Sequence, residues 1–403
     1  MPESPILVVG GTQREFAQAR AALGKARDLR FVLRVEAESA VNLSTAEAHA
    51  RLDRGAPLAD LFDAADVALG GRRPGAILCN AELDLVAAAS LRGHYHLPGQ
   101  DVASATAFRD KLVMKSRLAR SGISVPRFAD CRTAGDAQAA AVAWGGDVLL
   151  KPRDSFGARD IFRVGANAVV GDLPTILPGT YMAEEFIQGR LFHVDGVVYD
   201  HRCVFSWASE YLTAPLDFDH SRGGGSLILE PEDPNLTRLR AFAERCLQAM
   251  PTPSGTAFHM DVFETPDGRL LAGEIASRSA GNRIRGSHFA AFGVDLMQAA
   301  YRAQAGFPLR ANLRATPAVM SGWGSLRMRP GLVERLPDLS WPPPGVLAAR
   351  FHANVGERLS AARGAADSLL SFVLTGDTQR AVRARWSDAL DWALARCDVA
   401  IMV

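Results

Sequence analysis

The chain has 403 residues, of which 48% are hydrophobic and 22% are charged, and its formal net charge is +1. This is the balance of an ordinary globular protein with enough residues for roughly two to four domains or subdomains. The near-neutral charge excludes a basic field for nucleic acid and an acidic tail.

The cysteines and the first residues indicate the compartment. The five cysteines are scattered and include no CxxC pair, which disfavours a disulfide framework or a zinc site and suits a reducing cytosol. No basic leader precedes the apolar run in MPESPILVVGG, and no stretch approaches the roughly 18 apolar residues of a membrane span. We expect a cytoplasmic protein without membrane or nucleic-acid partners, and a homodimer as the default oligomer.

The first part of the chain alternates strand and helix patterns. PILVVGG is a short apolar run that ends in two glycines, which predicts a buried parallel strand that opens into a turn. REFAQARAALGKA has helical spacing, RFVLRVEA is typical of a second strand, and ADVALG and GAILCN are typical of further β–α units. Residues 1–98 are therefore predicted to form an open α/β domain. The glycine pair is not GxGxxG, so a nicotinamide site has little support.

The pattern changes after Pro98-Gly99. ATAFRDKLVMKSRLARSG predicts a helix that ends at Gly122, because glycine adopts the left-handed cap conformation at no steric cost. Strands and turns are expected from there to residue 310, with a helix at NLTRLRAFAERCLQAM. The tail after 311 predicts short strands at AVMSGWGSLRM and VLAARFHANV and a final helix at TQRAVRARWSDALDWALARC.

Lys151 ends the apolar run GDVLL and opens the stretch KPRDSFGARD, after which IFRV is typical of another strand. A lysine at the rim of such a turn can hold a phosphate, or it can be an ordinary solvated side chain. A Walker-type P-loop is excluded, because the glycine spacing is wrong and a strand follows instead of a helix.

A hairpin is predicted at FHMDVFETPDGRLLAGEIASR, around the turn signal Pro266-Asp267-Gly268. With a two-residue turn at Asp267-Gly268, Asp261 and Glu274 lie directly opposite each other on one face. Opposed like charges destabilise a sheet, and a divalent cation between them removes that cost; Mg²⁺ near phosphates takes one or two carboxylates plus waters. The alternative is a pair of solvated acids on an exposed face.

Two further segments carry chemistry. Arg278 leads into SAGNRIRG, where a turn with glycine and asparagine beside a guanidinium can bind an anion; a charged loop is the alternative. YMAEEFIQG contains an apolar connector whose free backbone groups can bind an adenine.

In this order, these segments resemble the ATP-grasp superfamily, and most closely the carboxylate–amine ligases that make dipeptides and related amides, the L-amino acid ligases. The resemblance covers nearly the whole chain and implies an α/β ATP-grasp fold. It places an open parallel α/β domain at 1–98, a linker helix and small lobe at 99–183, a large lobe with the metal hairpin at 184–310, and the C-terminal part of that lobe at 311–403.

The resemblance also implies roles for individual residues. The implied ATP-binding residues are Lys111, Lys151, Ser155, Phe156, Gly157, Glu184, Glu185, Phe186, Ile187 and His193. The implied metal ligands are Asp261 and Glu274, for Mg²⁺ or alternatively Mn²⁺. The implied catalytic residues are Arg278, Lys151 and Glu82, and the implied substrate-binding residues are Glu82, Arg278, Gly281, Asn282 and His288.

Three positions depart from the family pattern. Ala276 stands where many relatives have an asparagine metal ligand, so we expect either that the metal shell has fewer protein ligands than usual or that Ser277 or water completes it. Leu191 stands where many relatives have a ribose-binding glutamate, and Gly157 is the only glycine of the covering loop. No lysine or main carboxylate is lost, so we expect an active enzyme.

The resemblance implies a reaction in which ATP phosphorylates a carboxylate and an amine displaces phosphate. We expect residues 154–159 to close over the phosphates and exclude water. Candidate bases for the amine are Glu82, His193, His259 and His288. The two strand histidines, His193 and His259, are more often core or sheet-face residues, whereas Glu82 follows a strand at its C-terminal end, where α/β sheets bind ligands.

The stretch SEYLTAPLDFDHSRGGGS, at 209–226, is interpreted as a substrate loop because three glycines permit close approach or motion. Two other functions compete with amide ligation. One is another ATP-grasp chemistry, either carboxylase-type or on a nucleotide precursor. The other is a catalytically weak ATP-binding protein, which only Ala276 and Leu191 favour.

Overall fold

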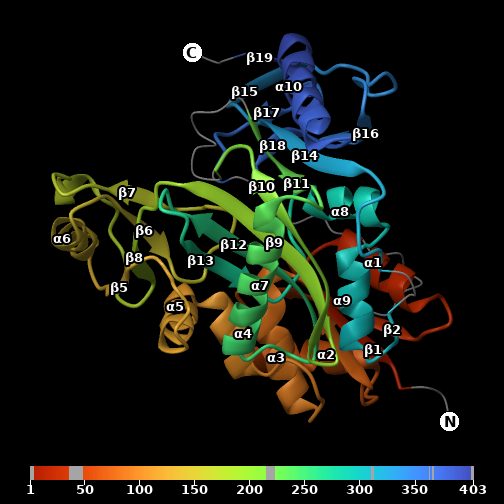
Figure 1. Ribbon diagram of the computed structural model, residues 1–403. Coiled ribbons are helices and arrows are strands. Elements are labelled where there is room, and N and C mark those ends of the chain that lie inside the picture. The colour runs from red at the N-terminus through yellow and green to blue at the C-terminus, as the bar shows by residue number, and fades with distance from the viewer. Residues whose placement is uncertain are drawn as a thin grey trace.

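The computed structural model describes residues 4–35, 49–214, 223–309, 313–362, 364 and 367–400. Within those ranges, none of the helices combines the length and the apolar character that a membrane crossing requires. Figure 1 shows a small sheet with one helix at one side of the molecule, a larger sheet through its centre, and a long helix at the C-terminal end.

The N-terminal part is an open parallel sheet, as predicted. Its strand order is β3-β2-β1-β4, and the paired strands are parallel. The elements are β1 (Ile6–Gly10), α1 (Gln13–Leu23), β2 (Leu29–Val35), β3 (His49–Asp53), α2 (Leu58–Leu69), β4 (Ala76–Cys79), the 3₁₀ turn η1 (Glu82–Asp84) and α3 (Leu85–His94). The segment ADVALG lies at the end of α2 and is not a strand, because Ala65, Ala68 and Leu69 form part of the buried face of that helix, whereas Val67 is exposed.

The predicted helix after residue 99 is two helices, α4 (Val102–Arg109) and α5 (Lys111–Arg120). Asp110 separates them and caps α5, since its carboxylate accepts hydrogen bonds from the N–H groups of Leu112 and Val113 at 2.9 and 3.1 Å. Gly122 has the expected left-handed conformation, with φ of 76°. The break places Lys111 at the first position of α5.

The small sheet has the order β5-β8-β6-β7 and packs against one helix. Its elements are β5 (Phe128–Cys131), α6 (Ala134–Trp144), β6 (Val148–Pro152), β7 (Phe162–Val164), the 3₁₀ turn η2 (Val170–Asp172) and β8 (Tyr181–Glu185). The predicted boundary between 183 and 184 falls inside β8. The division of the chain into four parts stays a prediction.

The large sheet has eight strands in the order β13-β12-β9-β10-β11-β14-β18-β16, and every adjacent pair is antiparallel. Its strands are β9 (Arg190–Tyr199), β10 (Arg202–Tyr211), β11 (Gly223–Ile228), β12 (Gly255–Glu264), β13 (Leu270–Ala276), β14 (Met320–Arg327), β16 (Val346–Phe351) and β18 (Ser368–Gly376). The tail strands therefore continue the sheet that begins before residue 200.

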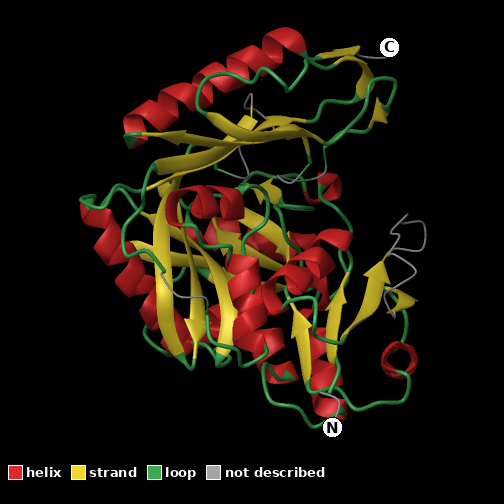
Figure 2. Ribbon diagram, turned by 90° about the vertical axis from the view of Figure 1, so that its right-hand side faces the viewer, coloured by secondary structure: helices red, strands yellow, loops and turns green. Residues whose placement is uncertain are grey.

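Four helices pack on this sheet: α7 (Pro234–Ala249), α8 (Ile284–Phe292), α9 (Leu296–Gln304) and α10 (Gln379–Arg396). Side chains alternate along β14, so Ser321 meets Ser287 of α8, whereas a Cβ added at Gly322 would lie 3.2 Å from Val382 of α10. Helices α8 and α10 thus cover opposite faces, and Figure 2 shows α10 lying along the C-terminal strands. A three-stranded sheet completes the chain: β15 (Gly331–Arg335), β17 (Arg358–Leu359) and β19 (Asp398–Ala400).

Helix α9 joins the large sheet to the N-terminal domain. Met297 and Tyr301 are buried in the same cluster as Phe16 and Phe31 of the N-terminal domain. The Arg302 guanidinium donates to the carbonyl of Ala22 at 2.7 Å. The N-terminal sheet is therefore held against the large sheet by apolar packing as well as by polar contacts.

The glycines at 223–225 lie in β11, so the loop conformation expected for them is wrong. A Cβ at Gly223 would lie 2.0 Å from the carbonyl oxygen of Ser325, and one at Gly225 would lie 2.4 Å from both the Trp323 carbonyl oxygen and the Trp386 indole nitrogen. Glycine is required there by close packing in the sheet. Residues 215–222 of the predicted loop lie outside the described residues.

Candidate active site

A cavity of about 490 Å³ lies between the small sheet and the large sheet, next to the hairpin β12–β13. It brings together most of the residues that the sequence singled out. The predicted residues that line it are Lys151, Phe156, Gly157, Glu184, Glu185, Phe186, Ile187, Asp261, Glu274, Arg278, Gly281 and Asn282. Lys111, Ser155, Glu82, His193 and His288 lie outside its lining.

The hairpin places its two acids as predicted, by a different turn. Asp261 and Glu274 are directly opposite each other. The turn is a three-residue loop between Thr265 and Arg269, with the Thr265 N–H donating to the Arg269 carbonyl at 2.9 Å. That loop alone would pair Asp261 with Gly273. A β-bulge leaves Gly273 as an extra residue and restores the pairing with Glu274.

Two predicted lysines approach the cavity from different elements. The Lys151 ammonium, at the end of β6, lies 2.7 Å from a Glu184 carboxylate oxygen. The Lys111 ammonium lies 3.2 Å from Glu274 and donates to the Ser155 carbonyl at 2.5 Å. Lys111 therefore lies behind Glu274, which lines the cavity, and does not line the cavity itself. Ser155 contacts Lys111 through its backbone carbonyl.

Lys115 is a third lysine that sequence reasoning missed. Its fully buried ammonium lies 2.6 Å from Glu184 and donates to the Gly273 carbonyl at 2.7 Å, a group freed by the bulge. Burial lowers the pKa of Lys115 to about 8. Two signals could have found it: it lies four residues after Lys111 on the same helix face, and it is one of only four lysines among 45 lysines and arginines.

The Glu184 carboxylate pairs with both Lys115 and Lys151. It is therefore not free to contact an adenine. Burial alone would raise the pKa of Glu184, but Lys115 and Lys151 lower it below its usual value. The adjacent connector supplies the apolar wall that the hinge assignment requires, with Phe186 and Ile187 on the cavity. The Phe186 N–H is already bonded to the Asp147 carbonyl at 3.0 Å, so that group is not available to a ligand.

The loop after β6 covers one end of the cavity. Phe156 and Gly157 line it, and the Arg159 guanidinium lies 5.2 Å from the centre of the Phe156 ring. Gly157 and Ala158 both have left-handed φ values, 66° and 57°, and such a conformation in Ala158 costs free energy. Arg159 also pairs with Asp367 at 3.3 Å. The loop therefore bridges the small sheet to the start of β18.

The acid pair suits a hard divalent cation. Both side chains line the cavity, and the Tyr211 hydroxyl donates to Asp261 at 3.1 Å. Burial raises the pKa of Asp261, and the facing Glu274 raises it further against the opposing effect of His259. A carboxylate pair with this mutual repulsion beside lysines fits Mg²⁺ or Mn²⁺. The expectation that Ser277 completes the metal shell does not agree with the structure. Its buried hydroxyl accepts a hydrogen bond from Gln100 at 2.8 Å.

One group of three residues with metal-ligand atoms occurs in the described ranges: His193, Asp195 and His259. Hydrogen bonds account for it, because the two histidine Nδ1 atoms lie 2.5 and 2.9 Å from the Asp195 oxygens. His193 is fully buried, and its other nitrogen lies 2.7 Å from the Ser226 hydroxyl. The assignment of His193 to ATP binding therefore does not agree with the structure, whereas His259 lines the cavity.

Arg278 is held by Glu82, an arrangement that does not agree with the base role expected for Glu82. Its carboxylate pairs with the guanidinium of Arg278 and with that of Arg109 at 2.5 Å. Burial alone would raise the pKa of Glu82, but Arg278 and Arg109 lower it below its usual value. A carboxylate with a lowered pKa and two arginine partners is a poor base, so Glu82 positions Arg278 at the cavity.

His288 is a core residue. It does not line the cavity, so the substrate-binding role expected for it does not agree with the structure. It is fully buried on α8, its Nδ1 atom lies 3.0 Å from the Ile284 carbonyl oxygen, and its ring lies near Phe205 and Phe292. Burial lowers the pKa of His288 below its usual value. The unfolded chain therefore binds a proton at this histidine over a pH range in which the folded chain does not.

Replacing His288 with Phe is expected to flatten the pH dependence of stability below about pH 6.5. In the wild type, the free energy of unfolding should fall as the pH drops through that range, because only the unfolded state gains the proton. Urea denaturation at pH 7.5 and pH 5.5 measures this. His201→Asn, in an exposed turn with φ of 59°, is the control that should keep the wild-type slope. An equal slope in His288→Phe would contradict the assignment.

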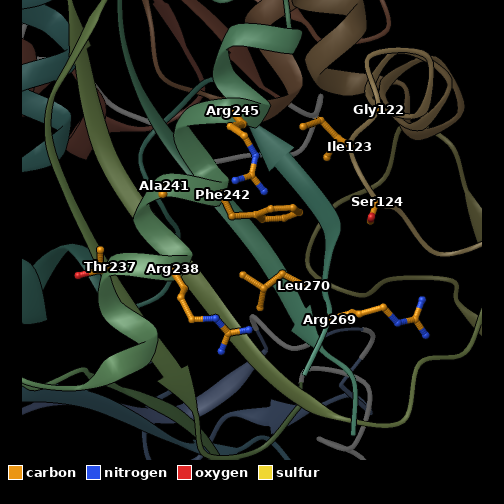
Figure 3. A pocket seen from close by; sticks show the side chains of 10 residues that line it. All are labelled: Gly122, Ile123, Ser124, Thr237, Arg238, Ala241, Phe242, Arg245, Arg269 and Leu270. Atoms are coloured by element: carbon orange, nitrogen blue, oxygen red, sulfur yellow. The ribbon is translucent and has the colours of Figure 1, made fainter. Parts of the chain in front are cut away.

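An open groove of about 560 Å³ beside α7 and β13 also contains three arginines, two of which are paired with acids. Arg238 lies 2.9 Å from Glu264, and Arg269 lies 2.7 Å from Asp267. Figure 3 shows the Arg269 side chain pointing away from Arg238 and Arg245. The third, Arg245, lies 5.4 Å from the centre of the Phe242 ring, so a single arginine among the described lining residues is left without an acid partner.

No family model matches the chain. One curated relative, the L-arginine-specific L-amino acid ligase of Bacillus subtilis, is 28% identical over 217 residues. The matched part is 52% of this chain and 52% of that protein, so it spans about half the length of the relative.

Solved structures match over nearly the whole chain. The L-amino acid ligase from Bacillus licheniformis has a TM-score of 0.74 at 15% identity and covers 100% of both chains. Carboxyaminoimidazole ribonucleotide synthase from Aspergillus clavatus, solved with ATP, has a TM-score of 0.73 at 16% identity and covers 97% of this chain and 99% of that one. Phosphoribosylglycinamide synthetase from Anaerococcus prevotii has a TM-score of 0.67 at 13% identity and covers 99% and 100%. These similarities establish a shared fold, as the sequence-based resemblance implied.

Proposed function

We propose that this chain, which has the ATP-grasp fold, is an ATP-dependent carboxylate–amine ligase. It would activate a carboxylate, most simply that of an amino acid, as an acyl phosphate and join it to an amine with release of ADP and phosphate. The observation that carries the proposal is the convergence on one cavity of Lys151, the opposed acids Asp261 and Glu274, and Arg278. The similarity to two L-amino acid ligases supports it.

The charge pattern of the cavity suits phosphoryl transfer. That reaction depends on positioning and on neutralising negative charge, with little covalent work for the protein. Lys151 and Lys111 provide positive charge on one side and Arg278 provides it on the other. Mg²⁺ held by Asp261 and Glu274 would supply charge neutralisation on the ATP phosphates. Glu82 keeps the Arg278 guanidinium in one orientation, which lowers the reorganisation that the reaction needs.

Water has to be excluded, because an acyl phosphate hydrolyses readily. Phe156 is the apolar residue of the covering loop that faces the cavity, and Arg159 packs over its ring. On the adenine side, Phe186, Ile187 and Leu191 form an apolar wall. Leu191 leaves the ribose without the carboxylate partner of many relatives. Cytoplasmic location and a homodimer remain predictions from the sequence.

The test is ATP-dependent phosphate release with pairs of amino acids, followed by trapping with hydroxylamine. We expect phosphate release to require both a carboxylate and an amine substrate. We also expect an acyl hydroxamate when hydroxylamine replaces the amine. ATP hydrolysis without regard to any such pair would contradict the ligase. Incorporation of bicarbonate would instead indicate a carboxylase-type reaction.

A further inference from the structure

A second cavity, of about 320 Å³, adjoins the candidate active site. Three separate parts of the chain build it: helix α1, the turn before α8, and the strands β16 and β18. The residues that define this arginine pocket are Arg14, Asn282, Arg283, Arg350, His352 and Ser371. Asn282 lines both cavities, so the arginine pocket begins where the active-site cavity ends.

The pocket gathers positive charge with no acid among its described lining residues. Burial and Arg285 lower the pKa of Arg14, and Asp295 and Glu15 outside the lining oppose part of this effect. In the part of the chain that the structure describes, Arg14 and Arg350 make no hydrogen bond or ion pair. Arg283 donates to the Ser371 hydroxyl at 2.9 Å, and the His352 Nε2 atom lies 2.7 Å from the same oxygen. No aspartate or glutamate is among the described residues that line the pocket. This differs from the groove of Figure 3, where Arg238 and Arg269 are paired with acids.

The crowding of these cations disfavours their charged forms. Burial lowers the pKa of Arg283, and Arg14 and Arg350 lower it further. Burial also lowers the pKa of His352, with Arg283 and Arg350 acting in the same direction. Like charges held together disfavour their charged forms, and a bound anion removes that cost. Guanidinium groups also match the geometry of carboxylate and phosphate oxygens.

We propose that the arginine pocket binds a carboxylate or phosphate group on the side chain of one of the two substrates. The proposed ligase then acts on a substrate whose side chain is negatively charged, in addition to the carboxylate that is activated and the α-carboxylate of an amino acid amine. This inference rests on the proposed function, since it extends the same site through the turn at Gly281 and Asn282. Asn282, whose backbone is left-handed with φ of 50°, lines both cavities.

Matched substrate pairs test the charge preference. Phosphate release is measured with L-glutamate against L-glutamine, and with O-phospho-L-serine against L-serine, each as the acid and as the amine component. We expect the charged member of one pair to have a kcat/KM at least about tenfold higher, since charge-assisted hydrogen bonds are the strong ones. The glutamate arm reports a carboxylate, and the phosphoserine arm reports a phosphate. Equal use of both members in both pairs would overturn the proposal.

Arg350→Gln is expected to remove the preference, mainly by raising KM for the charged member. Arg358→Gln, at an exposed arginine of β17 outside the pocket, is the control and should keep the wild-type ratio. A ratio that is unchanged in Arg350→Gln would place the preference elsewhere and overturn the proposal.

Direct binding separates this inference from the proposed function. Calorimetry with inorganic phosphate and with glutarate, on the full chain saturated with a non-hydrolysable ATP analogue, needs no ligase activity. We expect one of the anions to bind at least about tenfold more weakly to Arg350→Gln than to the wild type or to Arg358→Gln. Equal affinities in all three proteins, or no binding to any of them, would overturn the proposed anion site. Neither outcome would contradict the proposed ligase function. Binding without ligation of any pair would instead contradict the proposed function alone.

Discussion

Replacing Asp261 with Asn together with Glu274 with Gln is expected to lower kcat by about three orders of magnitude or more. The amides keep the shape of the hairpin but remove both negative charges that would hold the divalent cation. Loss of the charge stabilisation that such an ion supplies is worth several kcal/mol of barrier, and each 1.36 kcal/mol is about tenfold in rate. Initial rates of phosphate release over a range of Mg²⁺ concentrations measure the effect.

The matched control for this pair is Asp267→Asn. Asp267 is an exposed acid at the tip of the same hairpin and pairs with Arg269 at 2.7 Å. It should keep wild-type activity and Mg²⁺ dependence. The raised pKa of Asp261 means that its charge is unfavourable there, whereas Glu274 pairs with Lys111 at 3.2 Å and its pKa is lowered. The thermal midpoint therefore checks that the double variant is folded. An unchanged Mg²⁺ dependence in a folded double variant would refute the hairpin as the cation site.

Replacing Lys151 with Ala is expected to lower kcat about a hundredfold to a thousandfold, the loss seen when one preorganised charge or donor at a reacting group is removed. Its ammonium is buried at the cavity wall and held by Glu184 at 2.7 Å. The variant keeps the pair between Glu184 and Lys115 at 2.6 Å, so the carboxylate is not left alone. Steady-state kinetics with a saturating pair of substrates, together with the thermal midpoint, separate the catalytic loss from any unfolding.

Lys25→Ala is the natural control, because Lys25 is the one lysine of the chain outside this cluster and is exposed after α1. It should behave as the wild type. A near-normal kcat in Lys151→Ala would remove the phosphate role of Lys151 and leave Lys111 and Lys115 to carry it. A loss of activity that follows the thermal midpoint alone would indicate a structural role.

The sequence was most informative where a feature is local to one element or one hairpin. The opposed placement of Asp261 and Glu274 was predicted and is confirmed, because strand pairing across a short turn is set by a few neighbouring residues. Even there the predicted turn was one residue too short. The bulge at Gly273 restored the pairing of Asp261 with Glu274. A bulge depends on what the strand packs against, and here its carbonyl accepts the Lys115 ammonium at 2.7 Å.

The predictions failed where segments distant in the chain meet. Glu82 and Arg278 are nearly 200 residues apart, and their ion pair turns an expected base into a residue that orients Arg278. In the sequence, the three glycines of β11 are typical of a loop. The structure shows that glycine is required there because β14 and α10 approach the strand closely. His193 and His259 both lie within strand patterns of the sequence. In the structure His193 is fully buried, whereas His259 lines the cavity.

The sequence by itself determined the order of the elements, the α/β class, the lysine before the covering loop and the facing acids of the hairpin. These follow from short-range periodicity and turn chemistry, which each segment carries alone. The tertiary structure decided which charges meet, which histidines are buried, and where the arginine pocket lies. Burial and long-range ion pairs depend on packing between elements, so they exist only once the sheets and helices have assembled.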